Sequence, residues 1–198
     1  MDASKNKYSL RFNPPKEWNM VDSHNRFYFG LLYFNIFILE HFKYKGNLKM
    51  MEIGSYRGES TFMWASSGMF EEIICVDPYK GETDNKNEYF DEDWSTVKRD
   101  FWTNIRYFNN VKLVQDFSYN IIDSYPDNYF DFIYIDASHE YEDVKRDIQI
   151  SLPKVKHGGL IGGHDYQKPW TGVIDAVDEI FEKPDLVFED ESWVKIKS

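Results

Sequence analysis

Cysteine and long apolar runs are scarce in this sequence, and each scarcity excludes a class of protein. Cys75 is the only cysteine among 198 residues, so an internal disulfide is impossible. The N-terminus, MDASKNKYSL, is too polar for a secretory signal peptide, which points to the cytoplasm. The most apolar stretch, 27–39, is far shorter than the ~20 residues that span a membrane. We therefore expect a packed helix there and no association with membranes.

Positive charge is also in short supply. The 23 Lys and Arg residues are outnumbered by 34 Asp and Glu residues, which gives a formal net charge of −11. This balance disfavours the broad attraction to phosphates that nucleic-acid binding requires, so a small molecule is the expected partner. The length suits one domain, which we predict over 1–198. Aromatic residues make up 18% of the chain and favour an aromatic-rich core over a sugar-stacking surface.

From residue 48 onward, short apolar runs alternate with amphipathic segments, as in repeated β-α units. The expected strands are 48–53, 72–76, 111–115, 130–135 and 159–162. The expected helices are 60–67, 95–108, 140–152 and 171–181. Two short runs, 186–189 and 193–197, would pair as a C-terminal antiparallel hairpin. This order predicts an α/β core with a mostly parallel sheet over 46–198, preceded by a helical or cap segment at 1–45.

The first expected strand runs into a turn that contains Gly54 and Gly58, and then into a helix. Glycine lets a ligand approach the backbone of such a turn, and the helix N-terminus offers N–H groups to a carboxylate. The turn lacks the middle glycine of G-x-G-x-x-G, which disfavours the pyrophosphate of a nicotinamide dinucleotide. Asp77 ends the next strand about 20 residues later, the spacing at which an acid meets ribose hydroxyls. An adenosine ribose fits these features.

These segments resemble the motifs of class I S-adenosylmethionine-dependent methyltransferases. E-I-G-S-Y-R-G-E-S at 52–60 is similar to their first motif, and Asp77 to their ribose-binding acid. F-D-F-I-Y-I-D-A-S-H-E-Y at 130–141 and G-G-L-I-G-G-H-D-Y at 158–166 resemble the small-molecule and sugar O-methyltransferases related to macrocin O-methyltransferase. The resemblance implies a Rossmann-like methyltransferase fold with a seven-stranded sheet and helices on both faces. It also implies methyl transfer from S-adenosylmethionine to a hydroxyl of a sugar, a glycan-like molecule or another small acceptor.

The same resemblance implies which residues contact the cofactor. They are Glu52, Gly54, Ser55, Gly58, Ser60, Asp77, Asp116, Ser118 and Asp136.

Four polar side chains follow the fourth and fifth expected strands: Asp136 and His139 follow one, and His164 and Asp165 the other. Neighbouring parallel strands lie ~4.8 Å apart, so the four would share one rim of the sheet. Asp136 and Asp165 would offer oxygen ligands to a divalent cation such as Mg²⁺, with His164 as a further candidate ligand. His164 stands where magnesium-binding relatives carry a second acid or amide, and its nitrogen suits zinc, iron or nickel better.

His139 is the candidate general base. An imidazole titrates near neutral pH, which suits removal of a proton from the acceptor hydroxyl. The resemblance implies the same role for a histidine three residues after the acid that ends the fourth strand.

Other interpretations stay open at this point. Asp136 could cap a helix, His139 could be a surface or capping histidine, and Asp165 could be a turn residue. The chain could be a nucleotide-linked oxidoreductase on the same sheet, or a non-catalytic protein that keeps the cofactor pocket. The acidic stretch 81–93 could be a lid or a solvated loop, and 8–18 could close over the site or contact another copy. The sequence leaves homo-oligomer formation open.

Overall fold

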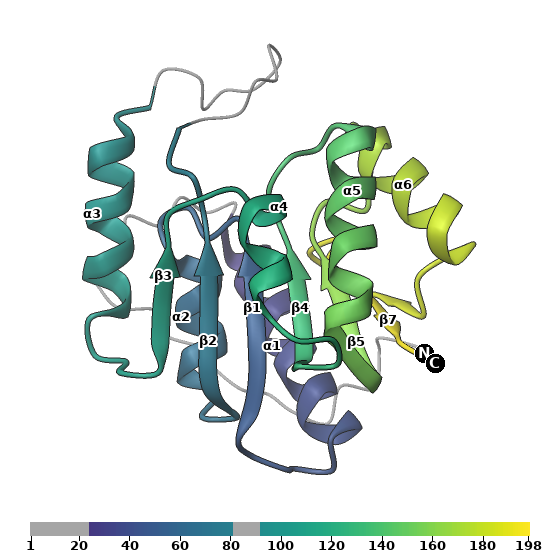
Figure 1. Ribbon diagram of the computed structural model, residues 1–198, viewed down its shortest axis with the longest axis horizontal. Helices are drawn as coiled ribbons and strands as arrows, with labels where there is room; N and C mark the ends of the chain where they lie inside the picture. The colour runs from purple at the N-terminus through teal and green to yellow at the C-terminus, as the bar shows by residue number, and fades with distance from the viewer. Residues whose placement is uncertain (1–23, 81–91) are drawn as a thin grey trace.

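The computed structural model describes residues 24–80 and 92–198, which build one seven-stranded sheet with helices on both faces (Figure 1). The 8–18 segment and all but the end of the 81–93 stretch lie outside the described residues. The strands are β1 (Leu48–Ile53), β2 (Phe70–Val76), β3 (Val111–Val114), β4 (Phe130–Ile135), β5 (Val155–Gly163), β6 (Leu186–Val187) and β7 (Trp193–Ile196). The α-helices are α1 (His24–His41), α2 (Glu59–Ser66), α3 (Trp94–Ile105), α4 (Ser118–Ile121), α5 (Tyr141–Ser151) and α6 (Thr171–Phe181). Two short 3₁₀ turns, η2 (Ile122–Ser124) and η3 (Leu152–Lys154), follow α4 and α5.

The strand order is β3-β2-β1-β4-β5-β7-β6, and the first five of these strands are parallel. β7 runs antiparallel to both β5 and β6 and forms the expected C-terminal hairpin. Register aligns the carboxyl ends of four strands, because Ile53 pairs with Val76 and with Ile135, and Ile135 pairs with Gly163. The residues that follow these four ends therefore form one rim. The predicted Rossmann-like fold with a seven-stranded, mostly parallel sheet is confirmed.

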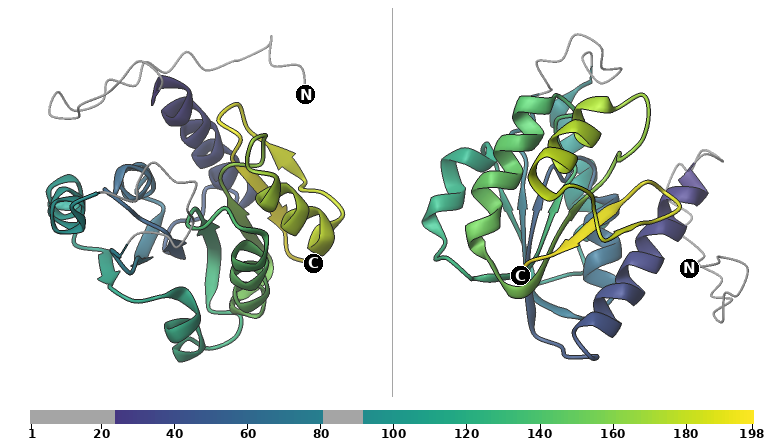
Figure 2. Two further views of the ribbon diagram at one scale, coloured as in Figure 1. Left: turned by 90° about the horizontal axis from the view of Figure 1, so that it is seen from above. Right: turned by 90° about the vertical axis from the view of Figure 1, so that its right-hand side faces the viewer.

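Helices cover the two faces of the sheet in two separate hydrophobic layers (Figure 2). α1, α2 and α3 pack on one face through side chains such as Phe34, Trp64 and Phe101. α5 and α6 pack on the other through side chains such as Ile148 and Val177. All six residues of β4 are buried, as expected for a central strand with helices on both sides.

The helix predicted over the apolar stretch 27–39 is the central part of α1, and it supplies an aromatic core. The buried ring of Phe34 lies 5.6 Å from the ring of Trp64, 5.3 Å from Phe132 and 4.6 Å from Phe188, measured between centroids. These contacts support the interpretation of the high aromatic content as core packing. Among the described residues, no helix has the length and apolar character needed to cross a membrane.

Several element boundaries differ from those expected. β5 begins at Val155 rather than at residue 159, because Val155 pairs with Phe130 ahead of the two glycines that interrupt its apolar pattern. β6 has only two residues, and the short helix α4 carries no periodic signal. The start of β5 is set by its pairing with β4, and local sequence patterns do not reveal pairing between strands.

A buried polar contact joins α4 to α5. The hydroxyl of Ser118 donates to the carboxyl of Asp147, and both residues are buried. Burial raises the pKa of Asp147 to about 6, although the hydrogen bond from Ser118 acts in the opposite direction. An ionised Asp147 is therefore costly to keep inside the folded protein.

Replacement of this acid by its neutral isostere should make stability less dependent on pH. In the folded state Asp147 binds its proton more tightly than in the unfolded chain, so its favourable contribution is complete below about pH 4 and is lost as the pH rises through about 6. We expect the free energy of unfolding of Asp147→Asn to exceed that of the wild type by up to about 3 kcal/mol above pH 7, with no difference near pH 4. Urea unfolding across this range measures the gap, with the exposed Asp175→Asn as control. A gap that does not change with pH would contradict the assignment.

Candidate active site

Gly54 follows β1 at the centre of the rim and has a positive φ of 84°. A Cβ atom at this position would lie 2.0 Å from the carbonyl oxygen of Asp136, so no side chain fits between the ends of β1 and β4. Gly58 follows in a left-handed conformation and is the N-cap residue of α2. Both glycines of the predicted motif thus meet a backbone requirement, and the turn lies directly beside Asp136.

Asp77 directly follows β2 and organises the same turn. One carboxylate oxygen accepts the backbone N–H groups of Ser55 and Tyr56, at 3.1 and 2.8 Å, and the other accepts that of Tyr79 at 2.8 Å. Burial raises the pKa of Asp77, while the three N–H groups favour its ionised form. Each carboxylate oxygen can accept two hydrogen bonds, so the oxygen that faces Tyr79 keeps room for a second donor. The predicted contact with ribose stays a prediction.

Glu52 lies deeper than the other residues predicted to bind the cofactor. Its fully buried carboxyl sits between β1 and α2, where it accepts hydrogen bonds from Thr61, from the indole of Trp64 at 3.0 Å and from the thiol of Cys75 at 3.6 Å. Burial raises the pKa of Glu52 to about 7. Ser60, in the first turn of α2, is also buried. In this structure Glu52 ties the helix after the glycine turn to the strand before it.

Asp116 and Ser118 lie beyond the carboxyl end of β3, as predicted. Asp116 accepts the side-chain amide of Asn120 and the backbone N–H of Phe117, both at 2.7 Å, and these bonds lower its pKa. The hydroxyl of Ser118 is engaged with Asp147. Both residues therefore shape the start of α4, on the side of the rim next to β2.

The four polar residues predicted after β4 and β5 do come together. Nε2 of His139 lies 2.9 Å from Oδ2 of Asp165, and Nδ1 of His164 lies 3.2 Å from the same oxygen. Asp136, His139 and Asp165 each offer one potential metal-binding atom, and these atoms all lie within 4.8 Å of one another. His164 is not in this group, so the structure groups His139, rather than His164, with the two predicted carboxylate ligands.

A small pocket is formed around this cluster, and apolar side chains line its inner side. Val144 comes from α5, Val173 from α6 and Trp193 from β7. The ring of His139 stacks on the indole of Trp170, with centroids 4.1 Å apart and planes inclined by 24°. The stack and the bond to Asp165 fix both the plane and the rotation of the imidazole. The N-cap residue of α5 is Glu140, so the structure gives no support to the alternative in which Asp136 caps that helix.

Burial and charge act strongly on this cluster. Burial raises the pKa of Asp136 to about 6, and the carboxylate of Asp165 acts in the same direction. Burial also opposes ionisation of Asp165, but hydrogen bonds from His139 and His164 hold its pKa well below the usual range. Burial lowers the pKa of His164, yet the surrounding carboxylates outweigh it and raise that pKa to about 9. At neutral pH the rim thus holds an anionic Asp165 beside a cationic His164.

Sequence reasoning missed one residue of this region, Asp190. It lies in the turn between β6 and β7 and is buried, with Oδ2 at 4.0 Å from Nε2 of His164. No local motif marks it, because only the antiparallel return of β7 along β5 brings this turn to the rim.

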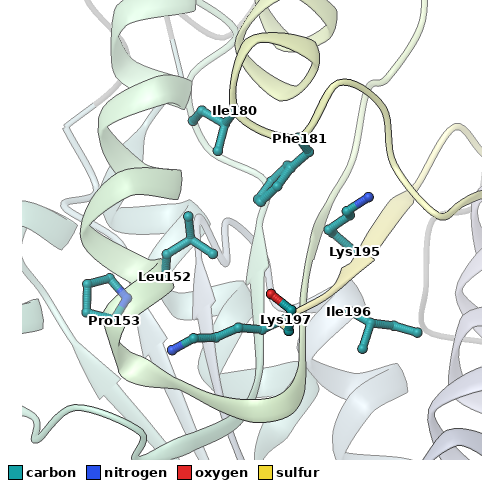
Figure 3. A pocket seen from close by; sticks show the side chains of 8 residues that line it. Leu152, Pro153, Ile180, Phe181, Lys195, Ile196 and Lys197 are labelled. Carbon is teal, nitrogen blue, oxygen red and sulfur yellow. The ribbon is translucent and has the colours of Figure 1, made fainter.

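A second pocket lies away from the rim, near the start of β5 and the ends of α5 and α6 (Figure 3). Leu152, Ile180 and Phe181 supply its apolar wall. Its two lysine ammonium groups already have oxygen partners, since Lys195 donates to Asp185 and Lys197 to the carbonyl of Val155. We assign no function to this pocket.

The rim and the strand order define a class I S-adenosylmethionine-dependent methyltransferase, and comparison with known proteins agrees. A family model described as a methyltransferase domain matches residues 51–166, and the protein belongs to this family. Uncharacterized protein R132 of Acanthamoeba polyphaga mimivirus is 29% identical over 145 residues, which cover 69% of this chain. The match spans 60% of the length of that relative.

Solved structures share the fold at low sequence identity. The O-methyltransferase NovP is 16% identical with a TM-score of 0.65, and the match covers 85% of this chain and 79% of NovP. A Staphylococcus aureus protein provisionally named a caffeoyl-CoA O-methyltransferase is 16% identical with a TM-score of 0.58, over 85% and 82% of the two chains. Cofactor-bound Rv0187 from MTB is 14% identical with a TM-score of 0.57, over 92% and 82%.

The close approach at Gly54 yields a prediction about stability. Gly54→Ala combines an unfavourable positive φ with a clash against Asp136, whereas Gly68→Ala has a positive φ but open space, and Gly46→Ala has neither. We expect Gly68→Ala to cost about 1–3 kcal/mol for strain alone. Gly54→Ala should cost clearly more, and Gly46→Ala little. Denaturant unfolding measures all three, and equal losses for Gly54→Ala and Gly68→Ala would show that the approach to Asp136 is unimportant.

Proposed function

We propose that this protein transfers a methyl group from S-adenosylmethionine to a hydroxyl of a sugar-like or other small acceptor, with His139 as the general base. The observation that carries the proposal is the pairing of His139 with Asp165 on the rim, beside Asp136 and the glycine turn. The cofactor supplies an electrophilic methyl group on its sulfonium. The carbon–sulfur bond breaks as the bond from carbon to the acceptor oxygen forms, and the hydroxyl proton passes to His139.

The pairing of His139 with Asp165 supports its role as a base. When Nε2 donates its proton to Asp165, the lone pair of the neutral ring resides on Nδ1, as in other histidine–carboxylate pairs. Nδ1 is shielded from solvent in this structure, so the proposal requires a neighbouring group to move before the acceptor hydroxyl reaches it. The anionic Asp165 then stabilises the imidazolium that forms as the acceptor loses its proton. The indole of Trp170, stacked on the ring, limits its motion and offers a flat surface of the kind that sugar rings and aromatic acceptors contact.

We also propose that a divalent cation, Mg²⁺ in the first instance, takes part at this site. The donor set fits such an ion, because Asp136 and Asp165 offer carboxylate oxygens within one cluster. When bound, the ion would lower the pKa of the acceptor hydroxyl. His139 belongs to the same cluster, so an ion that recruits its nitrogen would remove it as the base. The proposed arrangement keeps the ion on the two carboxylates and leaves His139 to take the proton.

Two features of the chain support a small acceptor and a cytoplasmic location. The excess of acidic residues favours a small acceptor over a nucleic acid. The single cysteine, Cys75, is free and buried, which is consistent with a cytoplasmic location.

Removal of the proposed base should reduce the rate without affecting the cofactor. We expect His139→Ala to lower kcat by about 10²- to 10⁴-fold, because the base acts in the transition state. The Kd for S-adenosylhomocysteine, measured by calorimetry, should stay within a few-fold of wild type. His157→Ala, at an exposed histidine far from the rim, is the control. Parallel loss of cofactor affinity would make His139 structural, and tight binding of NAD without binding of S-adenosylhomocysteine would overturn the proposed function.

Removal of divalent cations tests the metal separately. Exhaustive chelation should reduce methyl transfer, and added Mg²⁺ should restore it. Asp136→Asn should lose the response to Mg²⁺, since an amide is a weaker ligand than a carboxylate for this hard cation. The exposed Asp175→Asn should respond as wild type does. Unchanged activity after chelation would remove the metal from the mechanism and leave the role of His139 intact.

A further inference from the structure

A buried carboxylate lies behind His164 that neither the sequence motifs nor the proposed reaction uses. The side chain of Asp190 is 1% exposed, and its Oδ2 lies 4.0 Å from Nε2 of His164. Asp190 follows the segment 51–166 that matches the methyltransferase family, so family membership does not account for it. A nearly inaccessible carboxylate requires partners that compensate for its burial.

Asp190 is held in place by its own turn. Oδ1 accepts the backbone N–H of Ser192 at 3.1 Å, and Oδ2 accepts the hydroxyl of the same residue at 2.9 Å. The Ser192 hydroxyl lies 3.2 Å from the phenol oxygen of Tyr134, a fully buried residue of β4. Since Ser192 gives its proton to Asp190, it accepts the proton of Tyr134. A chain of buried hydrogen bonds thus runs from the centre of the sheet to Asp190.

Helix α1 provides the space that Asp190 occupies. A Cβ atom at Gly30 would lie 1.9 Å from Cγ of Asp190 and 2.0 Å from Oδ1, so the carboxylate rests against the helix backbone where a side chain would otherwise be. Glycine inside a helix costs about 1 kcal/mol relative to alanine, and this contact gives a reason for it. Nearby, Phe188 of the same turn stacks on Phe34 of α1 with ring centroids 4.6 Å apart.

His164 lies between two carboxylates. Asp190 is near its Nε2, and Oδ2 of Asp165 is 3.2 Å from its Nδ1. The same oxygen of Asp165 binds His139 at 2.9 Å. The side chains therefore form a row from Asp190 through His164 and Asp165 to the proposed base, in which the 4.0 Å link between Asp190 and His164 is an ion-pair contact longer than a hydrogen bond.

We propose that Asp190 is a positioning residue, which orients His164 so that His164 holds Asp165 against His139, and that Gly30 is required to accommodate it. The expected effect on rate rests on the proposed function, whereas the expected effect on the two histidine rings does not.

The first test is the substitution Asp190→Asn, with Asp185→Asn as the matched control. Asp185 lies in the same hairpin but is paired with Lys195 near the surface. We expect Asp190→Asn to shift the imidazole NMR resonances of both His164 and His139, and to leave those of exposed His157 unchanged. We expect kcat to fall about tenfold or more, as for other residues that orient ligating or catalytic groups, with the Kd for S-adenosylhomocysteine within twofold. Asp185→Asn should do neither.

The second test is a double-mutant cycle between the helix and the turn. Gly30→Ala alone should displace Asp190, shift the His164 and His139 resonances and lower the midpoint of thermal unfolding. In an Asp190→Ala background the clash is gone, so Gly30→Ala should leave the midpoint unchanged or raise it, as alanine ordinarily does within a helix. This reversal of sign distinguishes a specific contact from general damage to α1.

The outcomes separate the two proposals. If Asp190→Asn shifts the histidine resonances but the wild-type protein transfers no methyl group, the positioning role is supported and the proposed function is overturned. Unshifted resonances for Asp190→Asn, or equal effects of Gly30→Ala in both backgrounds, would overturn the positioning role whatever the activity. If Asp190→Asn does not fold, an additive cycle between Gly30→Ala and Asp190→Ala would by itself refute the contact.

Discussion

The contact between Gly54 and the backbone of Asp136 is the constraint on which the rest of the site depends. It brings the turn after β1 against the end of β4 with no space for a side chain. The turn carries the glycine motif predicted to bind the cofactor, and Asp136 begins the part of the rim that holds His139 and Asp165. Because register aligns the ends of these strands, one backbone contact fixes the distance between the two parts.

Charge balance is the second determinant of the rim. Three carboxylates, from Asp136, Asp165 and Asp190, face two imidazoles in a partly buried space. Neither set is stable there alone, since burial disfavours both an isolated carboxylate and an isolated imidazolium. The ionised state of Asp165 depends on its two histidines, and the cationic state of His164 depends on the carboxylates around it. Structure and charge in this region are therefore coupled, so a substitution at one of these residues changes the protonation equilibria of the others.

Much of this arrangement could be predicted from the sequence. Apolar runs located the five parallel strands and the C-terminal hairpin, and polar residues after β4 and β5 located the rim. What the sequence could not provide depends on contacts between distant segments. The cluster with Asp136 and Asp165 contains His139 rather than His164, and this depends on the three-dimensional placement of the two side chains, which spacing does not encode. Glu52 matched the first motif, yet its side chain faces Thr61 and Trp64 inside the protein. Gly30 carries no sequence signal of its contact with Asp190, because that contact joins α1 to a turn that is distant in the sequence.

Helix α1 packs against the sheet along most of its length, through buried side chains from Tyr28 to Ile38. Phe34 contacts the aromatic core near its middle, and at its C-terminal end the imidazole of His41 contacts the carbonyl oxygen of Gly158 at 2.7 Å. The helix lies before the segment by which the family is recognised, and β7, which closes the outer edge of β5, lies after it. The boundaries that sequence comparison draws around this domain therefore do not coincide with those of its packed structure. A fragment cut at residues 51 and 166 would keep every recognisable motif but lose α1, so Phe132 and Tyr134 of the central strand β4 would lose the cover that Phe34 gives them.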